Sequence, residues 1–133
     1  MTDAEHMITV VLADDDKGYL ELLHALVDQQ PLLKVVGIAL DGLEALECVE
    51  SIQPDALVID LHMPRMDGVE AVRRLRIDHP SLCLIAITAD ADPALHQSAE
   101  AAGADAVMLK GQLLEGLTDR IATARRERAA AVQ

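Results

Sequence analysis

Short apolar runs alternate with amphipathic segments along almost the whole chain, and this alternation strongly restricts the possible folds. Five aliphatic runs predict strands, and five stretches with apolar residues at helical spacing predict helices between them. The expected strands are 8–13, 35–39, 56–59, 82–87 and 106–109, and the expected helices lie near 20–27, 43–52, 69–75, 93–103 and 114–124. Strands that are apolar throughout are buried on both faces. The pattern therefore predicts an α/β domain with a doubly wound, five-stranded parallel sheet.

The chain length indicates one domain and one core. A chain of 133 residues has a common single-domain length. We expect the domain to span 8–126, with a disordered tail at 1–7 and either a tail or the start of a linker helix at 127–133. Hydrophobic residues make up 51% of the chain, and Tyr19 is its only aromatic residue. The core must therefore be aliphatic.

The charge and the cysteines exclude several classes of function. A formal net charge of −12 repels nucleic acid and anionic lipid, so we expect no direct binding of either by this domain. The basic cluster Arg125, Arg126 and Arg128 suits the end of a helix better than a nucleic-acid patch. Cys48 and Cys83 lack metal-ligand spacing and are typical of buried thiols in a reducing compartment. With no signal-like segment at 1–7 and no long apolar run, we expect a cytoplasmic protein.

Polar residues follow the carboxyl ends of the expected strands, where open parallel sheets bind ligands. They are Asp14, Asp15 and Asp16 after the first strand, Asp41 after the second, Asp60 after the third, Thr88 after the fourth and Lys110 after the fifth. Two of them have a simple structural explanation. Asp16 fits a helix cap, and Asp41 begins a turn with Gly42. The acids, the base and the hydroxyl that remain predict one site at this edge.

The chemistry of that site follows from its charge. Asp14, Asp15 and Asp60 would raise one another's pKa unless cations intervene. Lys110 supplies one positive charge, and Mg²⁺, or Mn²⁺ in its place, would supply two more and bind a phosphate oxygen. A carboxylate can then attack phosphorus and form an aspartyl phosphate. The metal and the lysine would stabilise the transferred group, and Thr88 could donate a hydrogen bond to it.

The chain resembles the response-regulator receiver domains over roughly 8–126. The most specific segment is PDALVIDLHMPRMDG at 54–68, which resembles the phosphoacceptor motif with Asp60 as the acceptor. The acidic pair at 14–15, the Ile-Thr-Ala sequence at 87–89 and the Gly-Ala-Asp sequence before Lys110 resemble the other motifs of the family. The resemblance implies a flavodoxin-like (βα)5 fold with strand order 2-1-3-4-5.

The resemblance also assigns roles to individual residues. Asp15 and Asp60 would bind Mg²⁺ directly and Asp14 mostly through water, and the backbone carbonyl of His62 would complete the protein ligands. Thr88, Ala89 and Lys110 would bind the phosphoryl group and transmit its presence. The donor would be a phosphohistidine on a sensor histidine kinase or a phosphotransfer protein. Phosphorylation would change the surface of the fourth helix, fifth strand and fifth helix, which commonly forms homodimers in this family.

Two positions depart from the family pattern, and two others have open roles. Val107 replaces the usual aromatic residue three positions before the lysine, so rotation of an aromatic ring is not available as a switch. Gly111 replaces the usual proline and leaves the next loop less constrained. His62 and Asp90 each lie two residues beyond a site residue. They either tune the lifetime of the phosphoryl group or are simply exposed loop residues.

Two other functions compete with this one, and the output of the domain is open. A Mg²⁺-dependent phosphatase with an aspartate nucleophile usually has a second acid where this chain has His62, and it usually has a cap insertion. A nucleotide-binding module needs a glycine-rich turn where this chain has Asp14 to Lys17. The segment 32–42 is similar to receivers that precede a LuxR/NarL-type helix-turn-helix. The chain is therefore either a single-domain regulator or a fragment of a DNA-binding one.

Overall fold

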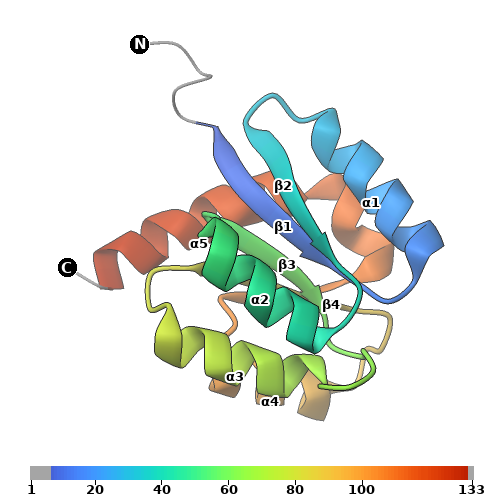
Figure 1. The fold of residues 1–133 in the computed structure, drawn as a ribbon, viewed down its shortest axis with the longest axis vertical. Helices are drawn as coiled ribbons and strands as arrows, with labels where there is room; N and C mark the ends of the chain where they lie inside the picture. The colour runs from blue at the N-terminus through green and yellow to red at the C-terminus, as the bar shows by residue number, and fades with distance from the viewer. Residues whose placement is uncertain (1–6, 132–133) are drawn as a thin grey trace.

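A computed structural model describes residues 7–131 and has the predicted architecture of parallel strands and intervening helices (Figure 1). The strands are β1 (Ile8–Ala13), β2 (Leu33–Ala39), β3 (Ala56–Asp60), β4 (Cys83–Thr88) and β5 (Ala106–Leu109). All neighbouring pairs are parallel, and their order β2-β1-β3-β4-β5 confirms the predicted 2-1-3-4-5 sheet. The helices are α1 (Lys17–Asp28), α2 (Gly42–Ile52), α3 (Gly68–Asp78), α4 (Pro93–Ala102), the 3₁₀ helix η2 (Lys110–Glu115) and α5 (Leu117–Ala131).

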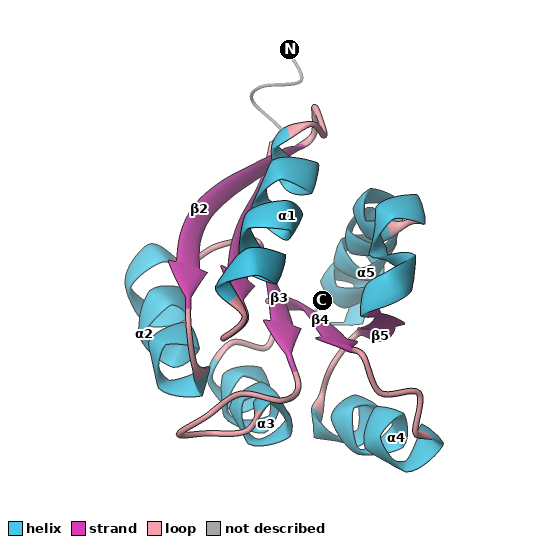
Figure 2. Ribbon diagram, turned by 90° about the vertical axis from the view of Figure 1, so that its right-hand side faces the viewer, coloured by secondary structure: helices cyan, strands magenta, loops and turns pink. Residues whose placement is uncertain are grey.

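The sheet is the middle of three layers, as Figure 2 shows. On one face, buried residues of α2, α3 and α4 pack against alternate residues of the central strands. On the other face, α1 and α5 cover the remaining strand residues. Both β3 and β4 are buried along their full length, which explains why they lack alternating polar residues.

Aspartates begin four of the five α-helices. Asp16, Asp41, Asp67 and Asp92 each accept a hydrogen bond from a backbone amide in the first turn of α1, α2, α3 and α4, respectively. Such caps satisfy amides that have no partner within the helix. The predicted cap at Asp16 is therefore confirmed, whereas Asp41, which was expected to begin a turn with Gly42, instead caps α2, whose first residue is Gly42. These caps also fix where each helix starts relative to the strand end before it.

The C-terminal helix differs from the predicted one at both ends. Residues after β5 form η2 first, so α5 begins at Leu117 rather than near 114. It then runs on through 127–131, where Arg128 donates hydrogen bonds from Nε and a terminal guanidinium nitrogen to Asp105 Oδ1 (3.1 and 2.7 Å). Of the tails expected at 1–7 and 127–133, residues 1–6 and 132–133 lie outside the described residues. Between residues 7 and 131, no helix is both long enough and apolar enough to cross a bilayer.

Candidate functional site

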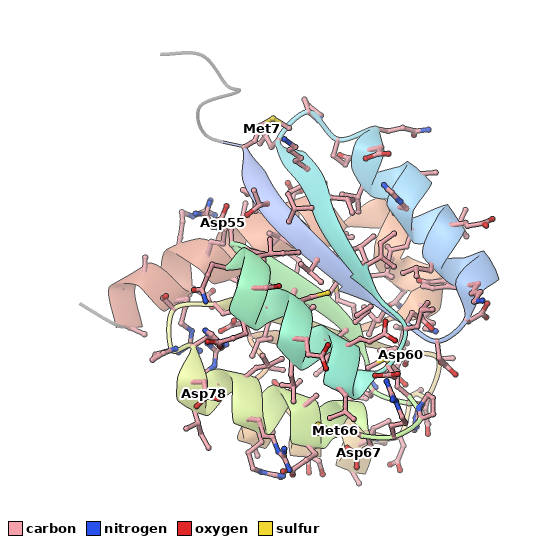
Figure 3. All side chains as sticks on the ribbon, viewed as in Figure 1. Met7, Asp55, Asp60, Met66, Asp67 and Asp78 are labelled. Carbon is pink, nitrogen blue, oxygen red and sulfur yellow. The ribbon has the colours of Figure 1, made fainter. Side chains whose placement is uncertain are left out.

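Three carboxylates meet at the carboxyl end of the sheet. Asp14 follows β1 and Asp60 ends β3, and these neighbouring strands are in register up to Ala13 and Ile59. One oxygen each of Asp14, Asp15 and Asp60 lies within 4.8 Å of the others. Asp14 and Asp60 are buried, whereas Asp15 is exposed. Figure 3 shows Asp60 at this end of the sheet and Asp55, at the start of β3, at the opposite end.

Lys110 brings a positive charge to the two buried carboxylates. Its Nζ lies 2.7 Å from Asp14 Oδ2 and 3.2 Å from Asp60 Oδ2. Burial alone would lower the pKa of the ammonium, but the close negative charges of Asp14 and Asp60 and the hydrogen bond to Asp60 outweigh burial and raise it. Lys110 therefore stays protonated between these carboxylates.

One lysine leaves the site short of positive charge. Burial raises the pKa of the Asp60 carboxyl, the hydrogen bond from the His62 amide lowers it, and the nearby charge of Asp14 raises it again. Asp14 Oδ2 is fully buried and contacts the Lys110 ammonium, yet it accepts no well-directed hydrogen bond from any described residue. An oxygen in that situation is suited to a hard cation, and these three carboxylates are the donor type that Mg²⁺ prefers. The residues present therefore fit a divalent metal.

Local hydrogen bonds aim the carboxylates. The Asp16 amide donates to Asp14 Oδ1 (2.9 Å), and the His62 amide donates to Asp60 Oδ1 (3.1 Å). Each bond spans two residues and stabilises a tight turn directly after the strand. The turns keep the second oxygen of each carboxylate toward Lys110. The side chain of His62 is exposed.

The structure places the other predicted residues at the same edge of the sheet. Thr88 is fully buried at the end of β4, and its Oγ1 accepts a hydrogen bond from the Asp90 amide (3.0 Å). Ala89 and Asp90 are exposed beyond it. Within residues 7–131, no hydrogen bond or ion pair joins Thr88, Ala89 or Asp90 to the three carboxylates. The aspartates and Lys110 are in contact, whereas Thr88, Ala89 and Asp90 lie at and just beyond the end of β4, the strand next to β3.

Tyr19 contacts the site from α1, a contact that sequence analysis did not predict. Its ring centroid lies 4.4 Å from Lys110 Nζ, and its hydroxyl donates a hydrogen bond to the Lys110 carbonyl (3.3 Å). Burial raises the pKa of this hydroxyl to about 12, so it remains a donor at neutral pH. Nothing in the sequence connects positions 19 and 110. The only available signal was that Tyr19 is the single aromatic residue.

A second contact missed by sequence reasoning fixes the loop after Asp60. Arg65, at a positive φ of 66°, donates from Nε to Asp41 Oδ2 (2.9 Å). Asp41 therefore serves both as the cap of α2 and as a partner for the loop. The backbone hydrogen bond from Glu44 lowers the pKa of the Asp41 carboxyl, and the bond and charge of Arg65 lower it further. The pair ties the loop after β3 to the start of α2.

Comparison with known proteins gives a consistent result. The family model of the response regulator receiver domain matches residues 10–122. The chain is 36% identical over 104 residues to protein-glutamate methylesterase/protein-glutamine glutaminase 4 of Myxococcus xanthus, covering 77% of this chain and 30% of that protein. It is 36% identical over 114 residues to the response regulator MprA of Mycobacterium ulcerans, covering 86% of this chain and 48% of that protein. The chain thus spans half or less of the length of these two relatives.

Solved structures agree with this result. The response regulator domain of Thermotoga maritima CheB superposes with a TM-score of 0.83 at 28% identity, over 90% of this chain and 97% of that chain. The receiver domain of the putative response regulator NarL from Mycobacterium tuberculosis superposes with a TM-score of 0.81 at 27% identity, over 88% and 98%. With the strand order and the family match, these similarities lead to one assignment. The chain belongs to the response regulator receiver domains, the receiver modules of two-component signalling.

Proposed function

We propose that Asp60 accepts a phosphoryl group from a phosphohistidine on a sensor histidine kinase or phosphotransfer protein. The observation that carries the proposal is the placement of Asp60 Oδ2 3.2 Å from Lys110 Nζ, with Asp14 and Asp15 beside it. Of the three acids, only Asp60 ends a strand in the middle of the sheet. The turn after β1 and the loop after β3 lie beside it. A nucleophile held in this way is positioned before the donor arrives.

The three carboxylates, with the backbone carbonyl of His62, would hold Mg²⁺, and Mn²⁺ offers the same chemistry. The bound ion would neutralise charge on the carboxylates and on the transferred oxygens. Asp15 is exposed and would face the ion from the solvent side. Asp14 Oδ2, which lacks a well-directed donor, would gain either the ion or one of its waters as a partner.

The transfer itself uses this chain's carboxylate as the nucleophile. An Asp60 oxygen attacks phosphorus in line, the new O–P bond forms, and the N–P bond to the donor imidazole breaks, so the electron pair leaves with that nitrogen. Lys110 stabilises the negative charge on the equatorial oxygens. The other ring nitrogen of the donor imidazole carries a proton during the transfer, so the products are an aspartyl phosphate on Asp60 and a neutral imidazole on the donor.

The phosphoryl group would then change the surface beside β5. Thr88, Ala89 and Lys110 would bind the added oxygens, and the loop from 89 to 92 and α4 would follow them. Val107 on β5 offers no aromatic ring to rotate, so the change would pass through packing of α4 against β5. This α4–β5–α5 face would control a partner, a homodimer or, in a longer protein, a DNA-binding or other output domain. A cytosolic kinase domain as donor would place the chain in the cytoplasm.

His62 and Asp90 are proposed to tune how long the phosphoryl group lasts. Both are exposed at the edge of the sheet that carries Asp60 and Thr88. A polar side chain there can orient or exclude the water that hydrolyses the aspartyl phosphate. Substitution of either residue should therefore change the rate of hydrolysis more than the rate of phosphorylation.

The test is incubation with acetyl phosphate and Mg²⁺, followed by intact mass measurement. The wild-type chain should gain one phosphoryl group, and Asp60→Asn should gain none. Asp78→Asn, which changes an exposed aspartate outside the site, is the matched control and should behave as wild type. EDTA should prevent modification. A wild-type chain that stays unmodified, or Asp60→Asn modified to the same extent, would overturn the proposal.

A further inference from the structure

Lys110 lies at the junction between β5 and η2, next to a glycine that contributes no side-chain packing. It follows the last residue of β5 and precedes Gly111, where an added Cβ would meet no atom within 4 Å. Its ammonium is held by Asp14 and Asp60, the same two carboxylates that are proposed to change partners during the reaction. A cation bound to Asp14 weakens the attraction of Asp14 for Lys110. Something other than the carboxylates must then keep the lysine near Asp60.

Tyr19 contacts Lys110 at both of its ends. The ring lies 4.4 Å below the ammonium, a distance typical of cation–π contact, and the hydroxyl donates a hydrogen bond to the carbonyl of the same residue. The ring is partly buried in the first turn of α1, which begins at the Asp16 cap directly after the acidic pair. One side chain therefore fixes the Lys110 backbone and faces its charge.

We propose that Tyr19 is a positioning residue that holds Lys110 in reach of the phosphoryl group on Asp60. This inference rests on the proposed function of Asp60. The ring attracts the ammonium anywhere over its face, so the ammonium can move from Asp14 toward the added oxygens and keep its contact with the ring. The hydrogen bond from the hydroxyl holds the Lys110 backbone, at the start of η2, in place while the ammonium moves. Tyr19 thus constrains Lys110 from another helix, whereas the neighbouring Gly111 adds no side-chain contact.

The first measurement compares phosphorylation rates with acetyl phosphate and Mg²⁺, followed by intact mass. Tyr19→Leu removes both contacts and should slow phosphorylation by about three- to ten-fold, the scale of a partly desolvated cation–π contact. Tyr19→Phe keeps the ring and should restore most of the rate. Leu22→Ala, an exposed position on the same helix, should leave the rate unchanged. In a Lys110→Met background, Tyr19→Leu should cause no further loss.

The second measurement does not need phosphorylation. In NMR spectra the ring should shift the side-chain protons of Lys110 upfield in the wild-type chain and in Tyr19→Phe, and this shift should disappear in Tyr19→Leu. Lys110 shifts that are the same in Tyr19→Leu and wild type would overturn the contact. So would an unchanged phosphorylation rate in Tyr19→Leu alongside a phosphorylated wild type. A wild-type chain that takes no phosphoryl group overturns the function of Asp60, and with it the role of Tyr19.

Discussion

The ammonium of Lys110 lies 2.7 Å from Asp14 Oδ2, although these residues follow β5 and β1, two strands that β3 and β4 separate in the sheet. The lysine side chain therefore spans the edge of the sheet beside Thr88 and reaches both buried acids. This pair is the principal charge compensation that residues 7–131 offer Asp14. Because a metal would compensate the same carboxylates, Lys110 and Mg²⁺ should oppose each other electrostatically.

Removal of the Lys110 charge should therefore tighten Mg²⁺ binding while slowing phosphorylation. Lys110→Met takes a cation away from the site, so repulsion of Mg²⁺ falls and its affinity should rise several-fold, whereas the equatorial oxygens lose a stabilising charge. Calorimetric titration with Mg²⁺ and acetyl phosphate modification by mass measure the two effects. Lys34→Met, an exposed lysine on β2, is the control. Weaker Mg²⁺ binding in Lys110→Met would contradict this account of the site.

Without metal, the Asp60 carboxylate should destabilise the fold at neutral pH. Burial, with the charge of Asp14, raises its folded pKa above the ordinary value of 3.8, despite the His62 amide and Lys110. Folding therefore takes up a proton between these two pKa values, and stability falls as pH rises through that interval. Asp60→Asn cannot ionise and should escape this loss.

The measurement is thermal unfolding in EDTA across pH. At pH 7, Asp60→Asn should unfold at a higher temperature than wild type, and the difference should shrink as pH falls and vanish below 3.8, where the carboxyl is protonated in both states. Saturating Mg²⁺ should stabilise wild type more than the variant, because the metal binds the charged form. Asp78→Asn should track wild type throughout. Equal stability of Asp60→Asn and wild type at pH 7 in EDTA would count against the raised pKa.

The fold could be predicted because its signals are local. Each strand consists mainly of aliphatic residues, and each α-helix except α5 starts at an aspartate cap that can be read in the sequence. The end of α5 depends instead on Arg128 meeting Asp105, a contact between residues that are not close in sequence. No periodicity reveals such a pair, which is why the predicted domain stopped at 126. The 3₁₀ turn before α5 was missed because apolar spacing looks alike in both helix types.

Like the fold, the site could be predicted only as far as local sequence signals define it. Strand ends share one edge in any parallel sheet, so strand prediction alone brought Asp14, Asp60 and Lys110 together. The contacts that aim these groups come from elsewhere in the chain. Tyr19 reaches Lys110 across 91 positions, and Arg65 reaches Asp41 across 24. Such side-chain contacts depend on how the helices and loops pack on the sheet, and this packing cannot be inferred from a single sequence.

The buried carboxylate of Asp105 should be among the most costly acids to remove. It accepts hydrogen bonds from Arg76 (2.9 Å), Arg128 and the Leu84 amide, and only 6% of its side chain is exposed. Asp105→Ala would leave the partly buried Arg76 charge and a backbone amide without this partner, at a cost of about 3 kcal/mol in unfolding free energy. Arg128→Ala loses a more exposed partner and should cost about 1 kcal/mol.

Urea denaturation of wild type, the two single variants and the double variant measures these costs. The double variant Asp105→Ala, Arg128→Ala should be little less stable than Asp105→Ala alone, since the pair is already broken. Additive losses would mean that Arg128 stabilises the domain through other contacts. Far-UV circular dichroism should report a shorter helix in Arg128→Ala if the pair holds the last turns of α5.

Two glycines near the site should respond in opposite ways to alanine. Gly68 opens α3, its amide donates to the Leu61 carbonyl (3.0 Å), and a Cβ there would overlap the Asp60 carbonyl and Leu61 Cα. Gly68→Ala must move the backbone of the proposed phosphoacceptor, so it should cost about 1–3 kcal/mol of stability and slow phosphorylation. Gly111→Ala meets no atom, and its smaller unfolded-state entropy should add about 0.5 kcal/mol. Urea unfolding and acetyl phosphate modification of both variants test this contrast. If Gly68→Ala is as stable and as reactive as Gly111→Ala, then the loop before α3 can accommodate a Cβ despite the close packing around Asp60.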